Sequence, residues 1–170
     1  MTAAVSANSD WRDRQPARLI DMIRRQAALN PDAPALTEAG GASIDYRGLA
    51  AAVAAAAETF ERLGVGPGDR VLIVNENSIA AVTALFAAAA LDAWPVPVNA
   101  RLSAREIDEI AKHCEPRRIV FTTGASPEAA VHAGRHGAEP VDLDRAGTVH
   151  VGPRGDGAPE PVTGDPVRDV

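Results

Sequence analysis

The sequence contains little of several residue types, and each scarcity argues against a class of function. Its 170 residues include a single cysteine, Cys114, so no disulfide can form within the chain and we expect a reducing, cytoplasmic location. Aromatic residues make up 4% of the chain, which leaves few side chains on which bases could stack. The net charge of −6 opposes a basic surface, so we predict no nucleic-acid partner.

Long hydrophobic runs are also scarce. The longest spans residues 79–91 and is interrupted by Thr83, whereas a membrane-spanning helix needs about 20 apolar residues. The first residues, MTAAVSANSDWRDRQ, have neither the basic nor the apolar region of a secretory signal. We therefore predict no membrane span, and we expect residues 1–15 to be disordered.

The sequence that follows has the composition of a globular domain. Its hydrophobic fraction is 46% and its charged fraction 24%, both ordinary values for such a domain. Helical periodicity over residues 18–29 is followed by two short strands, 35–37 and 42–44, around Gly40-Gly41, which predicts a hairpin. A helix over residues 46–63 comes next, with Asp45 as its N-cap.

Residues 62–122 alternate helices with short β-branched runs. The run VLIV within residues 70–74 is apolar on both faces, which is typical of a strand buried between two layers of helices. Further strands are expected at 95–98, 118–122 and 141–143, with helices at 79–91, from 104 to 113 and from Pro127. This order predicts an α/β fold with a mainly parallel sheet, flanked by helices on both faces, and a small N-terminal hairpin.

The composition divides the chain into parts. We expect one α/β domain over residues 16–144. Residues 145–170 are rich in glycine and proline and poor in large apolar residues, so they are expected to form a loop or linker.

Two glycine-rich segments resemble phosphate-binding loops in composition. Gly64-x-Gly66-x-Gly68 follows a helix and precedes a strand, whereas the dinucleotide fingerprint follows a strand and opens a helix. A helix C-cap and a tight turn are therefore the better interpretation. The segment from Gly152 to Gly157 lacks the lysine and hydroxyl of a P-loop.

A histidine pair is a candidate metal site. His132 and His136 are four residues apart, a spacing that can serve zinc on one face of a helix. Gly134 weakens that helix, and the sequence offers no third ligand beyond Glu139 or Asp142. We predict no metal site and no catalytic residue in these 170 residues.

Three longer segments carry a family resemblance. They are LIDMIRRQAALNPDAPALTEAGGASIDYRGLA, LGVGPGDRVLIVNENS and WPVPVNARLSAREI. In this order they resemble the N-terminal part of the ANL adenylate-forming superfamily of acyl- and aryl-CoA synthetases, peptide-synthetase adenylation domains and beetle luciferases. The resemblance covers residues 18–122, and Asn99, Arg101, Leu102 and Ser103 are more similar to the CoA ligases. Gly48 departs from the glutamate that the family usually has there.

The resemblance implies the activity of an AMP-forming acid–thiol ligase for the full-length protein. In that reaction a carboxylate attacks the α-phosphate of ATP and releases pyrophosphate, after which the thiol of CoA displaces AMP. The implied partners are a small-molecule carboxylic acid, ATP, Mg²⁺ and CoA, and none is expected to bind this piece tightly. The family's T-S-G-T-T-G-x-P-K-G loop is absent, although residues 165–170 resemble its lead-in. We expect these residues alone to be inactive.

The resemblance also suggests a binding site at Asn99, Ala100 and Arg101. This turn lies at the carboxyl end of a predicted parallel strand, where open α/β sheets bind ligands, and in some relatives it borders the CoA groove. The alternative is a strand-to-helix turn with a solvated arginine. Two other functions stay open: a standalone nucleotide-binding module, and a non-catalytic interaction domain. Self-association through an exposed core surface would fit either a truncated enzyme or the interaction domain. Fatty, aromatic and short-chain acids are all compatible with the sequence.

Overall fold

The structure is a computed structural model that describes residues 18–164. The expected disorder of residues 1–15 and the resemblance at 165–170 lie outside the described residues. The elements are α1 (Leu19–Leu29), β1 (Pro34–Thr37), β2 (Ser43–Asp45), α2 (Tyr46–Arg62), β3 (Arg70–Asn75), α3 (Ile79–Ala90), β4 (Trp94–Asn99), α4 (Ala104–Cys114), β5 (Arg118–Phe121), α5 (Pro127–Arg135), β6 (Glu139–Asp142), the 3₁₀ turn η1 (Asp144–Ala146) and β7 (Thr148–Val151).

The main sheet has five strands in the order β4-β3-β5-β7-β6. The strands β4, β3 and β5 are parallel to one another, and β7 runs antiparallel to both of its neighbours. The prediction of a mainly parallel sheet is confirmed, but the sheet is not purely parallel because of β7.

The strand β7 corrects the expectation that residues 145–170 form only a loop or linker. In its sequence, TVHV, polar residues alternate with Val149 and Val151. The two valines are buried against α2 and α3. Gly147 and Gly152 flank this run, so on the sequence alone its four residues were indistinguishable from the glycine-rich segment around them.

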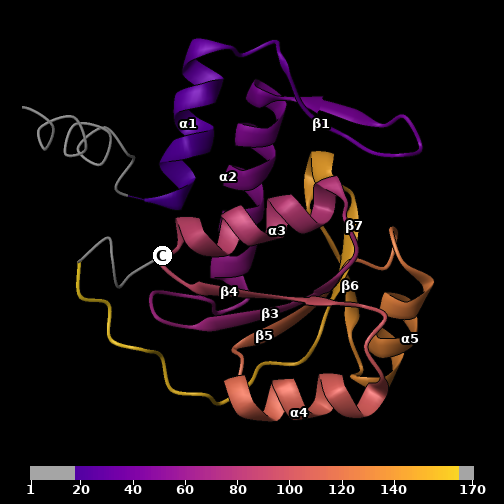
Figure 1. The fold of residues 1–170 in the computed structure, drawn as a ribbon. Coiled ribbons are helices and arrows are strands. Elements are labelled where there is room, and N and C mark those ends of the chain that lie inside the picture. Colours follow the sequence, from indigo (N-terminus) through magenta and orange to yellow (C-terminus); the bar gives the residue numbers. More distant parts are fainter. Residues whose placement is uncertain (1–17, 165–170) are drawn as a thin grey trace, which may run out of the picture.

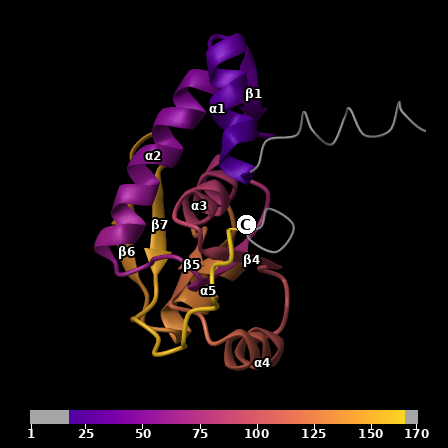
Figure 2. The same ribbon diagram turned by 90° about the vertical axis from the view of Figure 1, so that its left-hand side faces the viewer.

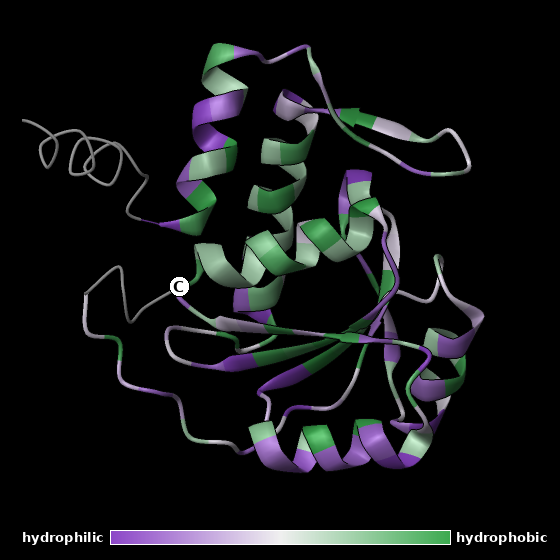
Figure 3. Cartoon of the chain, viewed as in Figure 1, coloured by the Kyte–Doolittle hydropathy of each residue, from purple (hydrophilic) through white to green (hydrophobic). Residues whose placement is uncertain are grey.

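Helices cover both faces of the sheet, as predicted (Figure 1). Side chains alternate along β3, so Val71 and Ile73 pack against α2 and α3 while Leu72 and Val74 pack against α4 and α5. Figure 3 shows apolar residues gathered on α2, α3 and the strands, whereas α4 is largely hydrophilic. The run VLIV is thus buried on both sides.

The hairpin of β1 and β2 forms a separate antiparallel pair, as expected. A third apolar cluster joins α1 and α2 through Ile20, Ile23, Leu49 and Val53. The hairpin also reaches α3, because the carboxylate of Glu38 accepts a hydrogen bond from the backbone N–H of Ile79 at 2.6 Å.

Residues 152–160, hereafter the strap, lie along the edge of the sheet where β3 and β5 begin (Figure 2). The guanidinium of Arg117 donates to the carbonyl oxygens of Gly155 and Gly157, at 2.7 and 2.9 Å. Its Nε donates to Asp69 at 3.0 Å, and both side chains of this ion pair are nearly buried. Part of the predicted linker is therefore held by specific bonds to the sheet.

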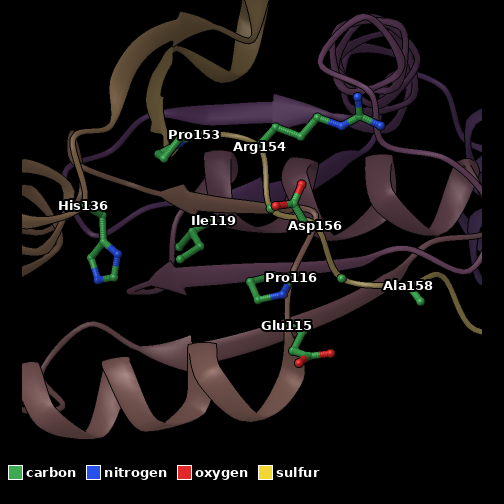
Figure 4. A pocket seen from close by; sticks show the side chains of 10 residues that line it. Glu115, Pro116, Ile119, His136, Pro153, Arg154, Asp156 and Ala158 are labelled. Carbon is green, nitrogen blue, oxygen red and sulfur yellow. The ribbon is translucent and has the colours of Figure 1, made fainter.

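A cavity of about 470 Å³ lies between the strap and the end of α4 (Figure 4). Glu115, Pro116 and Ile119 line one side, and Arg154 and Asp156 of the strap line another. It lies at the amino ends of the parallel strands, opposite to the edge at which α/β sheets bind ligands.

Candidate functional site

The carboxyl ends of β3 and β4 form the candidate site because the chain leaves these two neighbouring strands in opposite directions. From β3 it continues into α3 on one face of the sheet, and from β4 into α4 on the other (Figure 1). Two loops that diverge in this way leave a crevice between the strand ends, which is where open α/β sheets bind ligands.

A pocket of about 470 Å³ occupies this crevice. An apolar pocket of about 540 Å³, lined in part by Leu36, Val82 and Leu85, adjoins it and shares Asn75, Asn77 and Pro97. The lining of the first pocket is mainly polar: Asn75, Glu76, Asn77, Pro97, Val98, Asn99 and Arg101.

The structure separates the roles of the three residues predicted to bind CoA. Asn99 is exposed, and its Oδ1 accepts a hydrogen bond from the backbone N–H of Arg101 at 2.8 Å. Ala100 is fully buried in the core with Leu72, while its N–H donates to the Asn75 carbonyl at 2.9 Å. Asn99 and Arg101 therefore face the pocket, whereas Ala100 fixes the backbone beneath it.

Arg101 is held by a carboxylate that sequence reasoning did not identify. Its Nε donates to Glu76 Oε1 at 2.5 Å, and the hydrogen bond and negative charge of Glu76 raise the pKa of Arg101. The Arg101 side chain is 73% exposed, and its two Nη groups bind no other group among residues 18–164. Glu76 directly follows β3, so the rule that singled out the end of β4 would also have found it.

The two histidines that have the spacing of zinc ligands have other partners. Nε2 of His132 lies 3.0 Å from the carbonyl oxygen of Leu102 and 3.2 Å from that of Ala100. Nε2 of His136 lies 3.2 Å from Asp108 Oδ1, and its ring stands 5.5 Å from that of Phe121. Within the described part of the chain, no three His, Cys, Asp or Glu side chains are grouped to hold a metal ion.

The pKa of His136 is lowered, chiefly by burial and against the opposing effect of Asp108. As the pH falls, His136 therefore takes up a proton in the unfolded chain, near pH 6.5, before it does so in the folded protein. Protonation thus favours the unfolded chain, so the contribution of His136 to stability is present above about pH 6.5 and is lost below it. We expect the free energy of unfolding to fall between about pH 7.5 and about pH 5.5, and to fall less in His136→Phe. Urea unfolding at both pH values measures this, and equal falls in the two proteins would contradict it.

The glycine motif before β3 is structural, as predicted. Gly64 has a φ of +82° and closes α2, with its N–H bonded to the Glu61 carbonyl and that of Val65 bonded to the Phe60 carbonyl. The carbonyl of Glu160 in the strap approaches Gly68 so closely that a Cβ there would lie 1.9 Å from it. At Gly68 the chain's own backbone thus occupies the space beside the glycine.

None of the helices described is long and apolar enough to cross a membrane.

The comparisons with known proteins agree with this geometry. The family model for AMP-binding enzymes matches residues 23–164. The chain is 35% identical over 112 residues to a feruloyl-CoA synthase of Amycolatopsis sp, covering 65% of this chain and 23% of that enzyme. It is 29% identical over 120 residues to the long-chain-fatty-acid–CoA ligase FadD13 of Mycobacterium tuberculosis, covering 70% and 24%. It is also 31% identical over 122 residues to the hybrid PKS-NRPS synthetase thnA of Trichoderma harzianum, covering 72% and 3%.

Solved structures give the same result. The N-terminal subdomain of Klebsiella oxytoca NpsA aligns with a TM-score of 0.58 and 26% identity, over 64% of this chain and 28% of that one. The inhibitor-bound N-terminal domain of FACL13 from Mycobacterium tuberculosis aligns with a TM-score of 0.57 and 27% identity, over 60% and 26%. The chain spans about a quarter or less of the length of these relatives. With its α/β sheet and a family match over most of its length, this chain belongs to the AMP-binding enzymes, the ANL adenylate-forming superfamily.

Proposed function

We propose that this chain is the N-terminal portion of an AMP-forming acid–thiol ligase, which converts a carboxylic acid, ATP and CoA into acyl-CoA, AMP and pyrophosphate. The observation that carries the proposal is the family match over residues 23–164. Two of the similar proteins, the feruloyl-CoA synthase and the fatty-acid–CoA ligase, carry CoA in their names, and this chain covers about a quarter of each.

Within that enzyme, the turn after β4 contributes to the CoA groove. Arg101 offers a cation at the rim of a polar pocket, and Glu76 holds its Nε so that both Nη groups can meet an anion. A guanidinium presented in this way binds phosphate oxygens through charge-assisted hydrogen bonds. The adjoining asparagines, Asn75, Asn77 and Asn99, supply further polar groups.

The adenylation step requires groups that these residues do not supply. Transfer of a phosphoryl-type centre needs backbone amides, a cation and a metal to stabilise spreading negative charge. At Gly68, Gly155 and Gly157 a carbonyl oxygen of the chain itself lies within 2.2 Å of where a Cβ would be, so these glycines accommodate the chain's own backbone. We therefore expect ATP–pyrophosphate exchange by the 170-residue chain to equal the background without protein, and catalysis above it would contradict this part of the proposal.

A chimeric ligase tests the proposal directly. This chain replaces the matching N-terminal segment of FadD13, and acyl-CoA formation from a fatty acid is assayed. Retained activity, compared with FadD13 lacking that segment, would support the assignment to a CoA ligase. A folded chimera that exchanges pyrophosphate but does not form acyl-CoA would contradict the CoA part of it.

In that chimera we expect Arg101→Ala to raise KM for CoA about tenfold, because one hydrogen bond between charged groups contributes about 1.5–3 kcal/mol. The rate of pyrophosphate exchange should not change, since CoA does not take part in that step. Arg105→Ala is the matched control, because Arg105 is 81% exposed, pairs with Glu109 one turn along α4 and does not line the pocket. An unchanged KM in Arg101→Ala rejects the CoA contact.

A further inference from the structure

A buried histidine of α5 is bonded to the turn that carries Arg101. His132 is 5% exposed, and its Nε2 lies within hydrogen-bond distance of the carbonyl oxygens of Ala100 and Leu102, the residues on either side of Arg101. A carbonyl oxygen can only accept, so Nε2 must carry the proton that is shared between them. This side chain thus reaches across about 30 residues of sequence to the backbone of the candidate site.

The other ring nitrogen of His132 is also occupied. Arg135, one turn further along α5, approaches Nδ1 at 3.4 Å through its Nη1. Its Nη2 pairs with Asp108 of α4 at 2.6 Å. The guanidinium can only donate, so Nδ1 accepts, and both neighbours of the ring require the same tautomer. The chain of contacts from Asp108 through Arg135 to His132 connects α4 and α5 with the turn.

We propose that His132 is a positioning residue for anion binding at Arg101. Its hydrogen bonds to the two carbonyl oxygens hold the backbone of residues 100–102 in place. The hydrogen bond to Glu76 holds the side chain of Arg101. Ala100 and Leu102 also lie in the apolar cluster that includes two alanines of α5. The N–H groups of Ala100, Arg101 and Leu102 are bonded to Asn75 and Asn99, so His132 supplies the hydrogen bonds that the carbonyl oxygens of the turn receive from α5. The inference rests on the proposed contact of Arg101 with CoA.

A histidine that merely fills the core would not explain this arrangement. Both carbonyl partners of His132 belong to the turn that follows β4. The polar pocket lies at this end of β4. Removing the N–H donor of His132 leaves the carbonyl oxygens of Ala100 and Leu102 without this hydrogen bond. Because an unpaired buried carbonyl costs free energy, we expect the turn to move so that water can reach these oxygens. The displaced backbone would carry Arg101 away from Glu76.

The first test uses the 170-residue chain without ligand. Nuclear magnetic resonance of the His132 ring should show a proton on Nε2. Amide exchange of Ala100 and Leu102 should accelerate at least about tenfold in His132→Phe, with little change at Leu72 in the centre of the sheet, which reports global opening. His132→Gln, which keeps an N–H donor, should recover most of the protection.

His113→Phe is the control for the change of side chain, because His113 is exposed on α4. Absence of a proton from Nε2 of His132, unchanged exchange of the two turn amides in His132→Phe, or the same acceleration at Leu72, would each overturn the inference. The tautomer is measured in the unmodified chain, so this result does not depend on whether a variant folds.

The second test titrates the chain with CoA and follows the amide resonance of Arg101. We expect His132→Phe to weaken binding at least about fivefold and His132→Gln to weaken it less. The double variant with Arg101→Ala should bind no more weakly than Arg101→Ala alone, because the two residues act through one contact. Unweakened binding in His132→Phe would overturn the inference. If the unmodified chain shows no response to CoA, the proposed CoA contact fails, and the exchange experiment alone decides whether His132 holds the turn.

Discussion

Replacing Arg117 with methionine should lower the free energy of unfolding by about 3–5 kcal/mol, because it leaves a buried charge without its partner. Arg117 and Asp69 are 12% and 8% exposed, and their charged groups lie 3.0 Å apart. Methionine preserves most of the apolar stem of the arginine, so the loss reports the charged group. The carbonyls of Gly155 and Gly157 lose their donors in the same variant.

Urea unfolding of the two proteins measures this difference. The control is Arg24→Met, since Arg24 pairs with Asp21 on the surface of α1 with side chains that are 61% and 38% exposed. Exposed pairs contribute about 0–1 kcal/mol, so this variant should unfold almost like the original chain. A loss in Arg117→Met no larger than in the control would show that neither the ion pair with Asp69 nor the bonds from Arg117 to the strap stabilise the fold.

A double replacement separates the charge from the strap. In Arg117→Met with Asp69→Leu no buried charge remains unpaired, so the double variant should recover part of the stability that Arg117→Met loses. The strap bonds are absent in both, and the N–H of Gly66 additionally loses its bond to Asp69 Oδ2. The stability still missing in the double variant therefore measures what these bonds contribute.

The central strands were predictable because their signal is local. The run VLIV of β3 is apolar at every position, and only burial between two layers explains such a run. Helix starts were equally clear, since Asp45 is the N-cap of α2, as predicted, and accepts a hydrogen bond from the Gly48 N–H. Each of these signals lies within one or two turns of the element that it defines.

The strap was not predictable because it is held by partners distant in sequence. Arg117 lies 38 and 40 residues before the two carbonyls that it binds, and Arg70 lies 88 residues before the carbonyl of Ala158. Glycine- and proline-rich composition indicates the absence of regular structure, but it carries no information about which carbonyls arginines will bind. For the same reason β7 was not predicted from the composition. Its place in the sheet depends on pairing with β5 on one side and β6 on the other.

The candidate site was predictable in part for the same reason. The position of Asn99 and Arg101 follows from the rule that loops at the carboxyl ends of parallel strands meet at one edge. Glu76 follows from that rule as well, once β3 and β4 are known to be neighbours. The role of His132 does not follow, because the pairing of α5 with the turn after β4 is a tertiary contact that helical spacing cannot reveal.

The three glycines before β3 should respond to alanine in a graded way. Gly68→Ala should cost about 2–4 kcal/mol, because a left-handed φ of +78° disfavours any side chain and the new methyl would meet the Glu160 carbonyl at 1.9 Å. Gly64→Ala should cost about 1–2 kcal/mol, since its φ is +82° but its nearest neighbour is the movable side chain of Arg154 at 3.5 Å. Gly66→Ala should be neutral or stabilising by up to about 1 kcal/mol, because nothing lies within 4 Å of the added methyl.

Urea unfolding of the three variants measures the series, and Gly66→Ala serves as the control within the same motif. Gly68→Ala should also release the strap, because the Glu160 N–H donates to the Gly68 carbonyl at 2.8 Å and Arg70 binds the Glu160 carboxylate. Faster proteolysis of the strap in Gly68→Ala than in Gly64→Ala would follow from that release. Equal costs at the three positions would mean that φ and the approach of the strap do not set the requirement for glycine. A motif that served as a phosphate loop would instead lose ligand binding at every position, with stability little changed.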